Sequence, residues 1–339
     1  MYGYFSSVKF WVSSCYNFFM LRSFIMYIFT ILFAGILCFI SVWLILPTFI
    51  YNGQITSPLP NFLTAFANDQ VTTIDLWSPL TKFNSSYAPL SLTAIAALSY
   101  DLTTGQTLYA RNATKEVPMA SLTKIMTAII SLEHPRFGDQ YTVPKNALVG
   151  EDSMGLDKGE MLSLQELLYG LVLHSGNDAA ETLAANFSGG RNAFIAAMNA
   201  KVATLGLSHT HYPNPTGLEG DGDQHTTAYD LLIITRYALT NFPLFDQVVG
   251  TFNITLPSSS IHKEYNLVNE TNLVSSYPGV KGVKDGYTPE AGLCLVTYLD
   301  YNGHKIIAII LGSTDRRGDM KNLLDFSLQQ EHIHPPQHE

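Results

Sequence analysis

The stretch ASLTKIMTA, residues 120–128, places a serine and a lysine three positions apart at the start of an apolar helical run. An α-helix turns about 100° per residue, so Ser121 and Lys124 are expected one turn apart on the same face. The apolar residues around them predict that this helix is buried. A buried lysine loses its hydration shell, and its pKa falls. A neutral amine beside a hydroxyl can accept its proton, so the pattern predicts a serine nucleophile with a lysine base.

Taken alone, this pair is a weak signal, because a serine at a helix start is often an N-cap and an early lysine is usually solvated. Two further motifs follow it: SGN at 175–177, between two helical runs, and KDG at 284–286, at the end of a short strand. Each also has a plain interpretation, as a glycine-containing helix cap and as an exposed hairpin. In this order, the three motifs form the set found in penicillin-binding proteins and β-lactamases.

The chain from about residue 92 to residue 330 resembles the serine-type D-alanyl-D-alanine carboxypeptidases, the low-molecular-mass penicillin-binding proteins. Four segments carry the resemblance, in the order of that family: ASLTKIMTA, LLYGLVLHSGNDAAETLA, NPTGLEGDGDQHTTAYDLLIITRYAL and GVKDGYTPEAGLCLV. The resemblance implies an α+β fold of the β-lactamase/transpeptidase type, with an antiparallel sheet and a helical subdomain. It also implies cleavage of the terminal D-alanine from peptidoglycan stem peptides, inhibition by β-lactams, and no need for a metal or organic cofactor.

The resemblance further implies a role for each motif residue. Ser121 would be the acylated nucleophile and Lys124 its general base. Ser175 would relay a proton to the leaving amine, and Asn177 would hold a backbone amide of the substrate. Lys284 would line the cleft and lend it positive charge.

The oxyanion hole would be formed by the backbone N–H groups of Ser121 and Tyr287. Loss of one such donor typically lowers the rate by about 10²- to 10³-fold. The residues expected to bind substrate are Lys284, Asp285, Gly286, Tyr287, Thr288 and Arg316.

Asp285 departs from the family, which usually has threonine or serine between the strand lysine and the glycine. A carboxylate there brings a like charge close to the terminal carboxylate of the substrate. Three outcomes stay open: Asp285 pairs with a cation and the site still works, the choice of substrate has moved, or activity is weak. The candidate cations are Lys284 itself and Arg316 or Arg317, and Thr288 is the candidate to supply the missing hydroxyl.

Residues 24–46 form a run of 23 residues without a charge. At about 1.5 Å per residue, this run spans a hydrocarbon core of about 30 Å. Lys9 and Arg22 precede it, and no lysine or arginine follows before Lys82. This bias predicts that residues 1–23 are cytoplasmic and that the catalytic domain lies outside the cytoplasm. The run ends without a small-residue cleavage site, which predicts an uncleaved single-pass anchor in the cell membrane.

The remainder divides into a linker over 47–91, the catalytic domain over 92–330, and a disordered tail over 331–339 whose three histidines are a weak candidate for metal binding.

Strands at both ends of the catalytic domain with helices between them predict an α+β fold whose terminal strands share one antiparallel sheet. Two strands joined by a turn at 103–106 are expected within 92–112. Helices are expected at 120–133, 163–174, 177–187, 191–205, 227–240 and about 318–330, and strands near 250–256, 279–284, 291–300 and 304–312.

Composition excludes some functions. A net charge of −9 with no basic cluster argues against a nucleic-acid partner. Three cysteines suit neither a disulfide framework nor a metal site. The absence of a G-x-S-x-G motif disfavours a Ser-His-Asp hydrolase.

Three alternatives share the expected fold. A β-lactamase of class A would need a Glu-x-x-x-Asn motif, and no glutamate between residues 177 and 284 has an asparagine four places later. A D,D-endopeptidase would differ only in the substrate beyond the scissile bond. An inactive wall-binding homologue finds its best support in Asp285.

Overall fold

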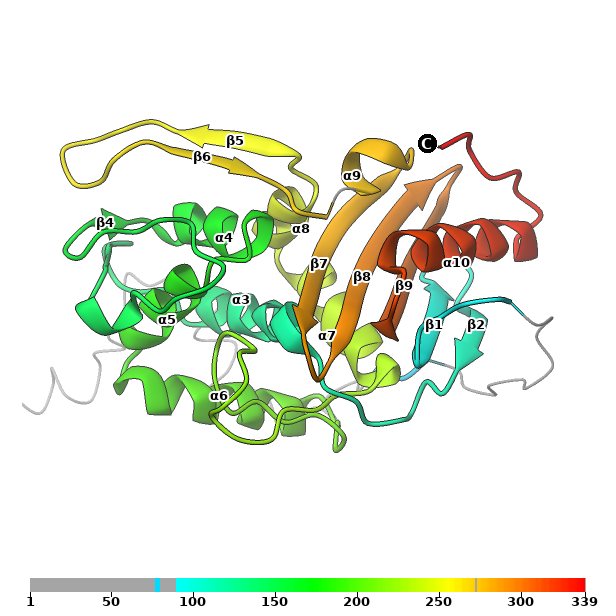
Figure 1. Cartoon of the computed structure of the whole chain (residues 1–339), viewed down its shortest axis with the longest axis horizontal. Coiled ribbons are helices and arrows are strands. Elements are labelled where there is room, and N and C mark those ends of the chain that lie inside the picture. Colours follow the sequence, from blue (N-terminus) through cyan, green and yellow to red (C-terminus); the bar gives the residue numbers. More distant parts are fainter. Residues whose placement is uncertain (1–76, 80–89, 272, 339) are drawn as a thin grey trace, which may run out of the picture. The chain divides into compact units, whose positions relative to one another are not determined.

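The computed structural model describes residues 77–79, 90–271 and 273–338 (Figure 1). Its centre is a five-stranded antiparallel sheet with the strand order β2-β1-β9-β8-β7. The strands are β1 (Ala96–Asp101), β2 (Gln106–Arg111), β7 (Val280–Thr288), β8 (Gly292–Tyr301) and β9 (His304–Ser313). β1 pairs with β9, so strands from the two ends of the domain share one sheet and the predicted α+β arrangement is confirmed.

Strand β9 shows how the sequence builds two layers on this sheet. It is joined to β8 by Asn302 and Gly303, which both have positive φ angles, as a two-residue hairpin turn requires. Ile306, Ala308 and Ile310 belong to one apolar core, whereas the alternate residues 307, 309 and 311 belong to the other. Because successive side chains of a strand point to opposite faces, this unbroken apolar run indicates a central strand covered on both faces.

One face of the sheet is covered by α10 (Arg316–Gln330), and the other by the helical subdomain (Figure 1). α7 (Ala228–Asn241) packs against β9 and β1 on that second face. The other helical elements are η1 (Ala120–Leu122), α3 (Thr123–Glu133), η2 (Lys145–Ala147), α4 (Leu164–Leu173), α5 (Asn177–Ala185), α6 (Gly190–Thr204), α8 (Pro243–Val249) and α9 (Leu273–Ser276). The long predicted helices are confirmed, whereas α8 and α9 were missed because they are too short to show a helical period.

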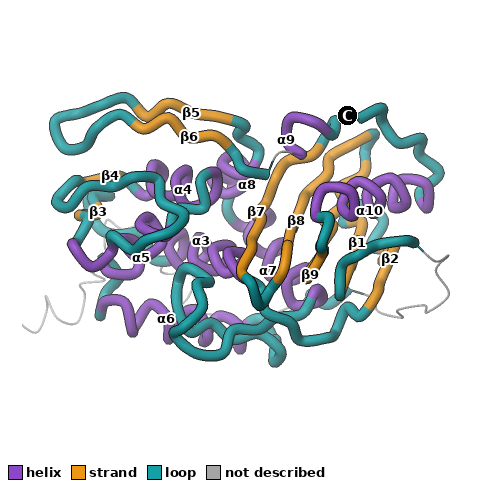
Figure 2. Tube along the Cα trace, in the orientation of Figure 1, coloured by secondary structure: helices purple, strands orange, loops and turns teal. Residues whose placement is uncertain are grey.

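Two small sheets complete the helical subdomain (Figure 2). One pairs β3 (Tyr141–Thr142) with β4 (Met161–Leu162), and the other pairs β5 (Asn253–Leu256) with β6 (Tyr265–Val268). Of these strands, only β5 was predicted. The β5–β6 hairpin leads back to the sheet and brings the residues that follow β6 close to the end of α4, where the N–H of Glu270 donates a hydrogen bond to the carbonyl of Leu173.

Residues 331–338 lie against the domain, in contrast to the disordered tail predicted there. Ile333 packs against the apolar core beneath α10, and His338 stacks on Tyr277 with ring centroids 4.7 Å apart. The predicted linker also reaches the domain, since Trp77 meets Tyr100 edge-on and lies beneath the guanidinium of Arg236. The predicted anchor over 24–46 falls outside the described residues. Within the residues that are described, no helix is both long and apolar enough to cross a membrane.

Asp319 fastens α10 to the start of the domain. Its buried carboxylate accepts hydrogen bonds from the Thr93 N–H (2.8 Å) and hydroxyl (2.7 Å), the Ala94 N–H (2.9 Å) and the Ser313 hydroxyl (2.7 Å). Burial works to raise the pKa of Asp319, but the hydrogen bonds from Thr93, Ser313 and Ala94 outweigh it and hold this pKa below its usual value. The charged form is therefore the one that stabilises the fold.

We predict that Asp319→Ala lowers the free energy of unfolding by about 3 kcal/mol at neutral pH, because several buried donors lose their acceptor. The folded-state pKa lies below the unfolded value, so this contribution is present above about pH 4 and is lost as the pH falls further. Urea unfolding should therefore show the difference between the variant and the wild type narrowing from about pH 5 to about pH 2. Asp300→Ala, which removes an exposed carboxylate on β8, serves as the control, and an equal loss in both variants would contradict the role of Asp319.

Candidate active site

Ser121 and Lys124 meet inside the domain, at the N-terminal end of α3. Ser121 lies in the 3₁₀ turn η1 and α3 begins only at Thr123, so the expectation that one α-helix carries both residues is wrong in detail. The predicted juxtaposition holds nevertheless, because Lys124 Nζ donates a hydrogen bond to Ser121 Oγ at 2.8 Å. Ala120, directly before the serine, has a φ of 49°, and such a conformation is strained for a residue with a Cβ.

The amine of Lys124 is completely shielded from solvent. Its second hydrogen bond goes to the backbone carbonyl of Thr216, at 2.8 Å. Burial, followed by repulsion from the charge of Lys284, lowers the pKa of Lys124 to about 7. Near neutral pH, a large fraction of this amine is therefore uncharged and able to take the proton of the Ser121 hydroxyl.

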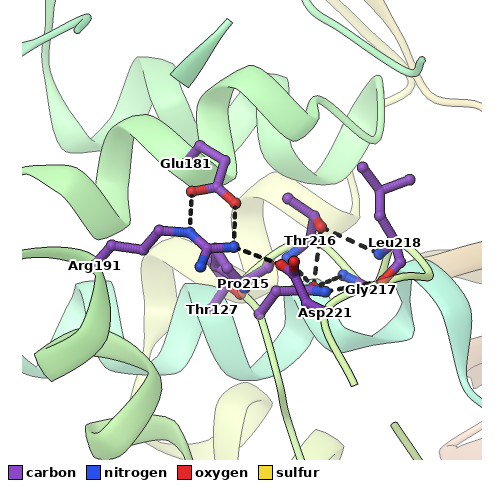
Figure 3. A network of polar contacts seen from close by, with 9 residues as sticks. Thr127, Glu181, Arg191, Pro215, Thr216, Gly217, Leu218 and Asp221 are labelled. Carbon is purple, nitrogen blue, oxygen red and sulfur yellow. Dashed lines mark hydrogen bonds and ion pairs between the residues drawn. The ribbon is translucent and has the colours of Figure 1, made fainter. Parts of the chain in front are cut away.

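The loop that carries Thr216 is fixed by its own polar contacts (Figure 3). Asn214 Oδ1 accepts hydrogen bonds from the N–H and hydroxyl of Thr216 and from the N–H of Gly217. Thr127, one turn after Lys124 on α3, donates its hydroxyl to the carbonyl of Pro215 at 2.6 Å. The helix that carries the lysine thus also holds the loop that supplies its second partner.

Arg191 secures the same loop from the other side (Figure 3). Its guanidinium, on α6, makes two hydrogen bonds to Glu181 on α5, at 2.8 and 3.0 Å, and pairs with Asp221 at 2.8 Å. A planar guanidinium held by two carboxylates has little freedom. The arrangement therefore limits how far the Thr216 carbonyl can move from Lys124.

Strand β7 passes close to the nucleophile. A Cβ on Gly286 would lie 2.9 Å from the backbone nitrogen of Ser121 and 3.2 Å from the Cβ of Ala120. Such contacts exclude a side chain, so only glycine permits this approach. The approach brings the backbone of β7 beside the N–H of Ser121, as an oxyanion hole shared with Tyr287 requires.

Ser175 and Asn177 flank Gly176 at the start of α5, and both side chains are buried. Ser175 has a φ of 52°, the second strained backbone position at this site. Within the described part of the chain, the amide oxygen and nitrogen of Asn177 have no hydrogen-bond partner. A buried unpaired polar group costs about 1–3 kcal/mol, so this amide is suited to a ligand that would pair with it.

Lys284, Asp285 and Arg316 form an ion-pair cluster at the middle of β7, which runs on to Thr288, so the prediction that the KDG motif ends the strand is wrong. Lys284 Nζ lies 2.6 Å from Asp285 Oδ1, and Arg316 lies 3.0 Å from Asp285 Oδ2. Burial works to raise the pKa of Asp285, but the charges of Lys284 and Arg316 and the hydrogen bond from Lys284 hold it below its usual value. Asp285 thus pairs with two cations at once, which is the pairing that the first of the three expected outcomes requires.

The remaining predicted binding residues lie further along β7. Tyr287 is exposed, whereas Thr288 is buried. The Thr288 hydroxyl oxygen accepts a hydrogen bond from the N–H of Ala291 at 3.1 Å, so this side chain caps the turn between β7 and β8. The residues singled out in the three motifs lie on η1, α3, α5 and β7, except Ser175, which lies in the connection between α4 and α5, and Arg316 begins α10.

Three acidic or basic residues at this site were missed from the sequence. Glu270 lies 3.8 Å from the ring of His174, and burial with repulsion from Asp285 raises its pKa against the opposing charges of Lys284 and His174. Asp152 acts electrostatically on both Lys124 and Glu270. No motif marks these residues, because the fold alone brings their separate loops together.

We predict that the side-chain amine of Lys124 titrates near pH 7. In lysine-labelled protein, its NMR signal can be assigned as the one that is lost in Lys124→Arg. Because burial rather than the serine sets the pKa, the same midpoint should persist in Ser121→Ala. A midpoint above about pH 9, close to that of an ordinary lysine, would contradict a neutral amine at this site.

A family model for the D-alanyl-D-alanine carboxypeptidases, peptidase family S11, matches residues 82–315. Among curated proteins, the chain is 33% identical over 251 residues to the carboxypeptidase DacF of Bacillus subtilis, a match that covers 71% of this chain and 64% of DacF. It is 34% identical over 220 residues to DacB2 of Mycobacterium tuberculosis, covering 64% of this chain and 74% of DacB2. A D-alanyl-D-alanine endopeptidase of Pseudomonas aeruginosa is 32% identical, with 75% and 82% covered. The chain thus spans less than two thirds of the length of DacF.

Two solved structures have the same fold. The DD-transpeptidase of Streptomyces K15 aligns with a TM-score of 0.67 and 30% identity, covering 72% of this chain and all of that one. Penicillin-binding protein D2 of Listeria monocytogenes, in an ampicillin-bound form, aligns with a TM-score of 0.62 and 27% identity, covering 71% of this chain and all of that one. With the family match, these similarities establish that the chain belongs to the D-alanyl-D-alanine carboxypeptidase family, peptidase family S11.

Proposed function

We propose that this protein is a serine peptidase that cleaves D-alanyl-D-alanine ends of peptidoglycan stem peptides through an acyl-enzyme on Ser121. The single observation that carries the proposal is the buried amine of Lys124, 2.8 Å from the Ser121 hydroxyl and shifted to a pKa of about 7. An amine in this state has no evident structural use, whereas it is what a serine nucleophile needs.

In the proposed acylation, neutral Lys124 takes the proton of Ser121 while the serine oxygen attacks the carbonyl carbon before the terminal D-alanine. The negative charge on the carbonyl oxygen is stabilised by the N–H groups of Ser121 and Tyr287. As the amide bond breaks, Ser175 passes a proton to the leaving nitrogen, and D-alanine departs. Water then attacks the ester on Ser121, which frees the shortened peptide and restores the serine hydroxyl.

Two groups would hold the peptide during these steps. The unpaired amide of Asn177 would accept and donate hydrogen bonds to the peptide backbone, which would end its unsatisfied state. Lys284, which is buried and paired with Asp285, would lend positive charge to the leaving side of the reaction.

A D,D-endopeptidase is the second candidate, and the Pseudomonas aeruginosa relative favours it. It would use the same residues on a cross-link, so cross-linked and uncross-linked peptides must be compared. A β-lactamase would instead hydrolyse its penicillin acyl-enzyme rapidly, whereas a penicillin-binding protein retains it. An inactive wall-binding protein would not be acylated at all.

We expect the full chain, in detergent, to release free D-alanine from a stem pentapeptide and to be acylated by a labelled penicillin on Ser121. Ser121→Ala should abolish the label and lower D-alanine release at least about 10³-fold, since the nucleophile is lost. Mass spectrometry of the labelled peptide identifies the modified residue, and Ser131→Ala, elsewhere on α3, is the matched control. Absence of both the label and D-alanine would overturn the proposed activity.

The location of the enzyme belongs to the same proposal. The uncharged run over 24–46, with Lys9 and Arg22 before it, supports a single-pass anchor in the cell membrane with the catalytic domain outside the cytoplasm. We expect protease added to intact spheroplasts to digest the domain while residues 1–23 stay protected. Protection of the domain, or its release from membranes by a high-salt wash, would contradict this orientation or the anchor itself.

A further inference from the structure

The carboxylate of Asp285 is already paired with both cations of the cluster that it forms with Lys284 and Arg316. Its two carboxylate oxygens are divided between Lys284, at 2.6 Å, and Arg316, at 3.0 Å. Arg316 also donates a hydrogen bond to the carbonyl of Gly286, at 3.4 Å. Gly286 is the residue whose Cα lies beside the backbone nitrogen of Ser121. The cluster therefore lies beside the reacting centre, with its positive charges held by a carboxylate of the protein.

Two further carboxylates contribute to the electrostatics of the same site. The charges of Lys284 and Asp285 act on the pKa of Glu270, and the charge of Asp152 acts on the pKa values of Glu270 and Lys124. The backbone fixes both residues there: the Glu270 N–H bonds to the Leu173 carbonyl, and the Asp152 carbonyl accepts the N–H of Asn177. The negative charge near this site thus comes from Asp285 together with Glu270 and Asp152.

A peptide that ends in a free D-alanine carries its terminal carboxylate only a few bonds from the scissile nitrogen. When the scissile bond of the peptide lies at Ser121, the terminal carboxylate of the peptide must come close to Asp285. It would have to share Lys284 or Arg316 with Asp285, displace Asp285 from one of these cations, or stay unpaired, and in each case the approach of a like charge to Asp285 costs binding free energy. A terminal carboxamide carries no charge, and its NH₂ group can donate to a carboxylate while its oxygen accepts from a cation.

We infer that this site prefers a leaving residue whose carboxyl group is uncharged, such as a C-terminal D-alaninamide, to one with a free carboxylate. The inference deepens the proposed function and rests on it. The chemistry is otherwise the same: Ser121 attacks the same carbonyl, the bond to the leaving nitrogen breaks, and D-alaninamide departs with the relayed proton. Water then hydrolyses the acyl-enzyme as before.

The test compares two peptides that are identical except for a terminal D-alanine or D-alaninamide, with the full chain in detergent. The wild type should show a kcat/KM at least about 10-fold higher for the amide. Asp285→Asn, which keeps the size and removes the charge, and Asp285→Thr should both raise activity on the free acid and reduce or reverse this ratio. Asp325→Asn is the matched control, since it removes a carboxylate on α10 away from the cleft, and it should leave the ratio unchanged.

The possible outcomes test this inference separately from the proposed peptidase function on which it rests. Equal rates on the two peptides, or a preference for the free acid, would overturn the inference and leave the peptidase activity established. A ratio that stays unchanged in Asp285→Asn and Asp285→Thr would overturn the role of Asp285. No cleavage of either peptide, together with no penicillin label on Ser121, would overturn both the inference and the proposed function.

Discussion

The site depends on one constraint: the amine of Lys124 must stay out of water while it touches Ser121. A shift of its pKa from 10.5 to about 7 corresponds to roughly 5 kcal/mol between the charged and the neutral amine. That cost falls on the folded state and must be offset by packing elsewhere. The apolar cores on both faces of the sheet supply the offset, and β9, buried on both faces, joins them.

The polar contacts around the lysine follow from the same constraint. A buried amine that has lost water needs defined partners, and the structure supplies Ser121 and the Thr216 carbonyl. A loop carbonyl is a reliable partner only if the loop cannot move. This explains why Asn214 binds three groups of its own loop and why Arg191 ties that loop to α5.

Much of this could be predicted from the sequence because the signals are local. The Ser121–Lys124 spacing predicts the same contact whether the first turn is α or 3₁₀, since either turn brings the two side chains together. The antiparallel sheet followed from alternating strands at the two ends of the domain. Glu270 and Asp152 could not be found in this way, because the β5–β6 hairpin and the start of α5 bring them together from distant segments. The Thr216 carbonyl is a backbone group, and no residue type marks it.

Asp285 illustrates why a departure from a family pattern needs the structure before it can be understood. From the sequence alone, it could equally signal a paired charge, a changed substrate or a failing enzyme. Its position between Lys284 and Arg316 shows that it also stabilises a lysine that is almost fully buried. Without a carboxylate at this position, the two cations would have to find an anion elsewhere or bear their mutual repulsion in a poorly solvated site. The same side chain thus pairs with both cations and, on the inference drawn above, would also set the charge that a substrate meets, which would couple fold stability and substrate choice through one residue.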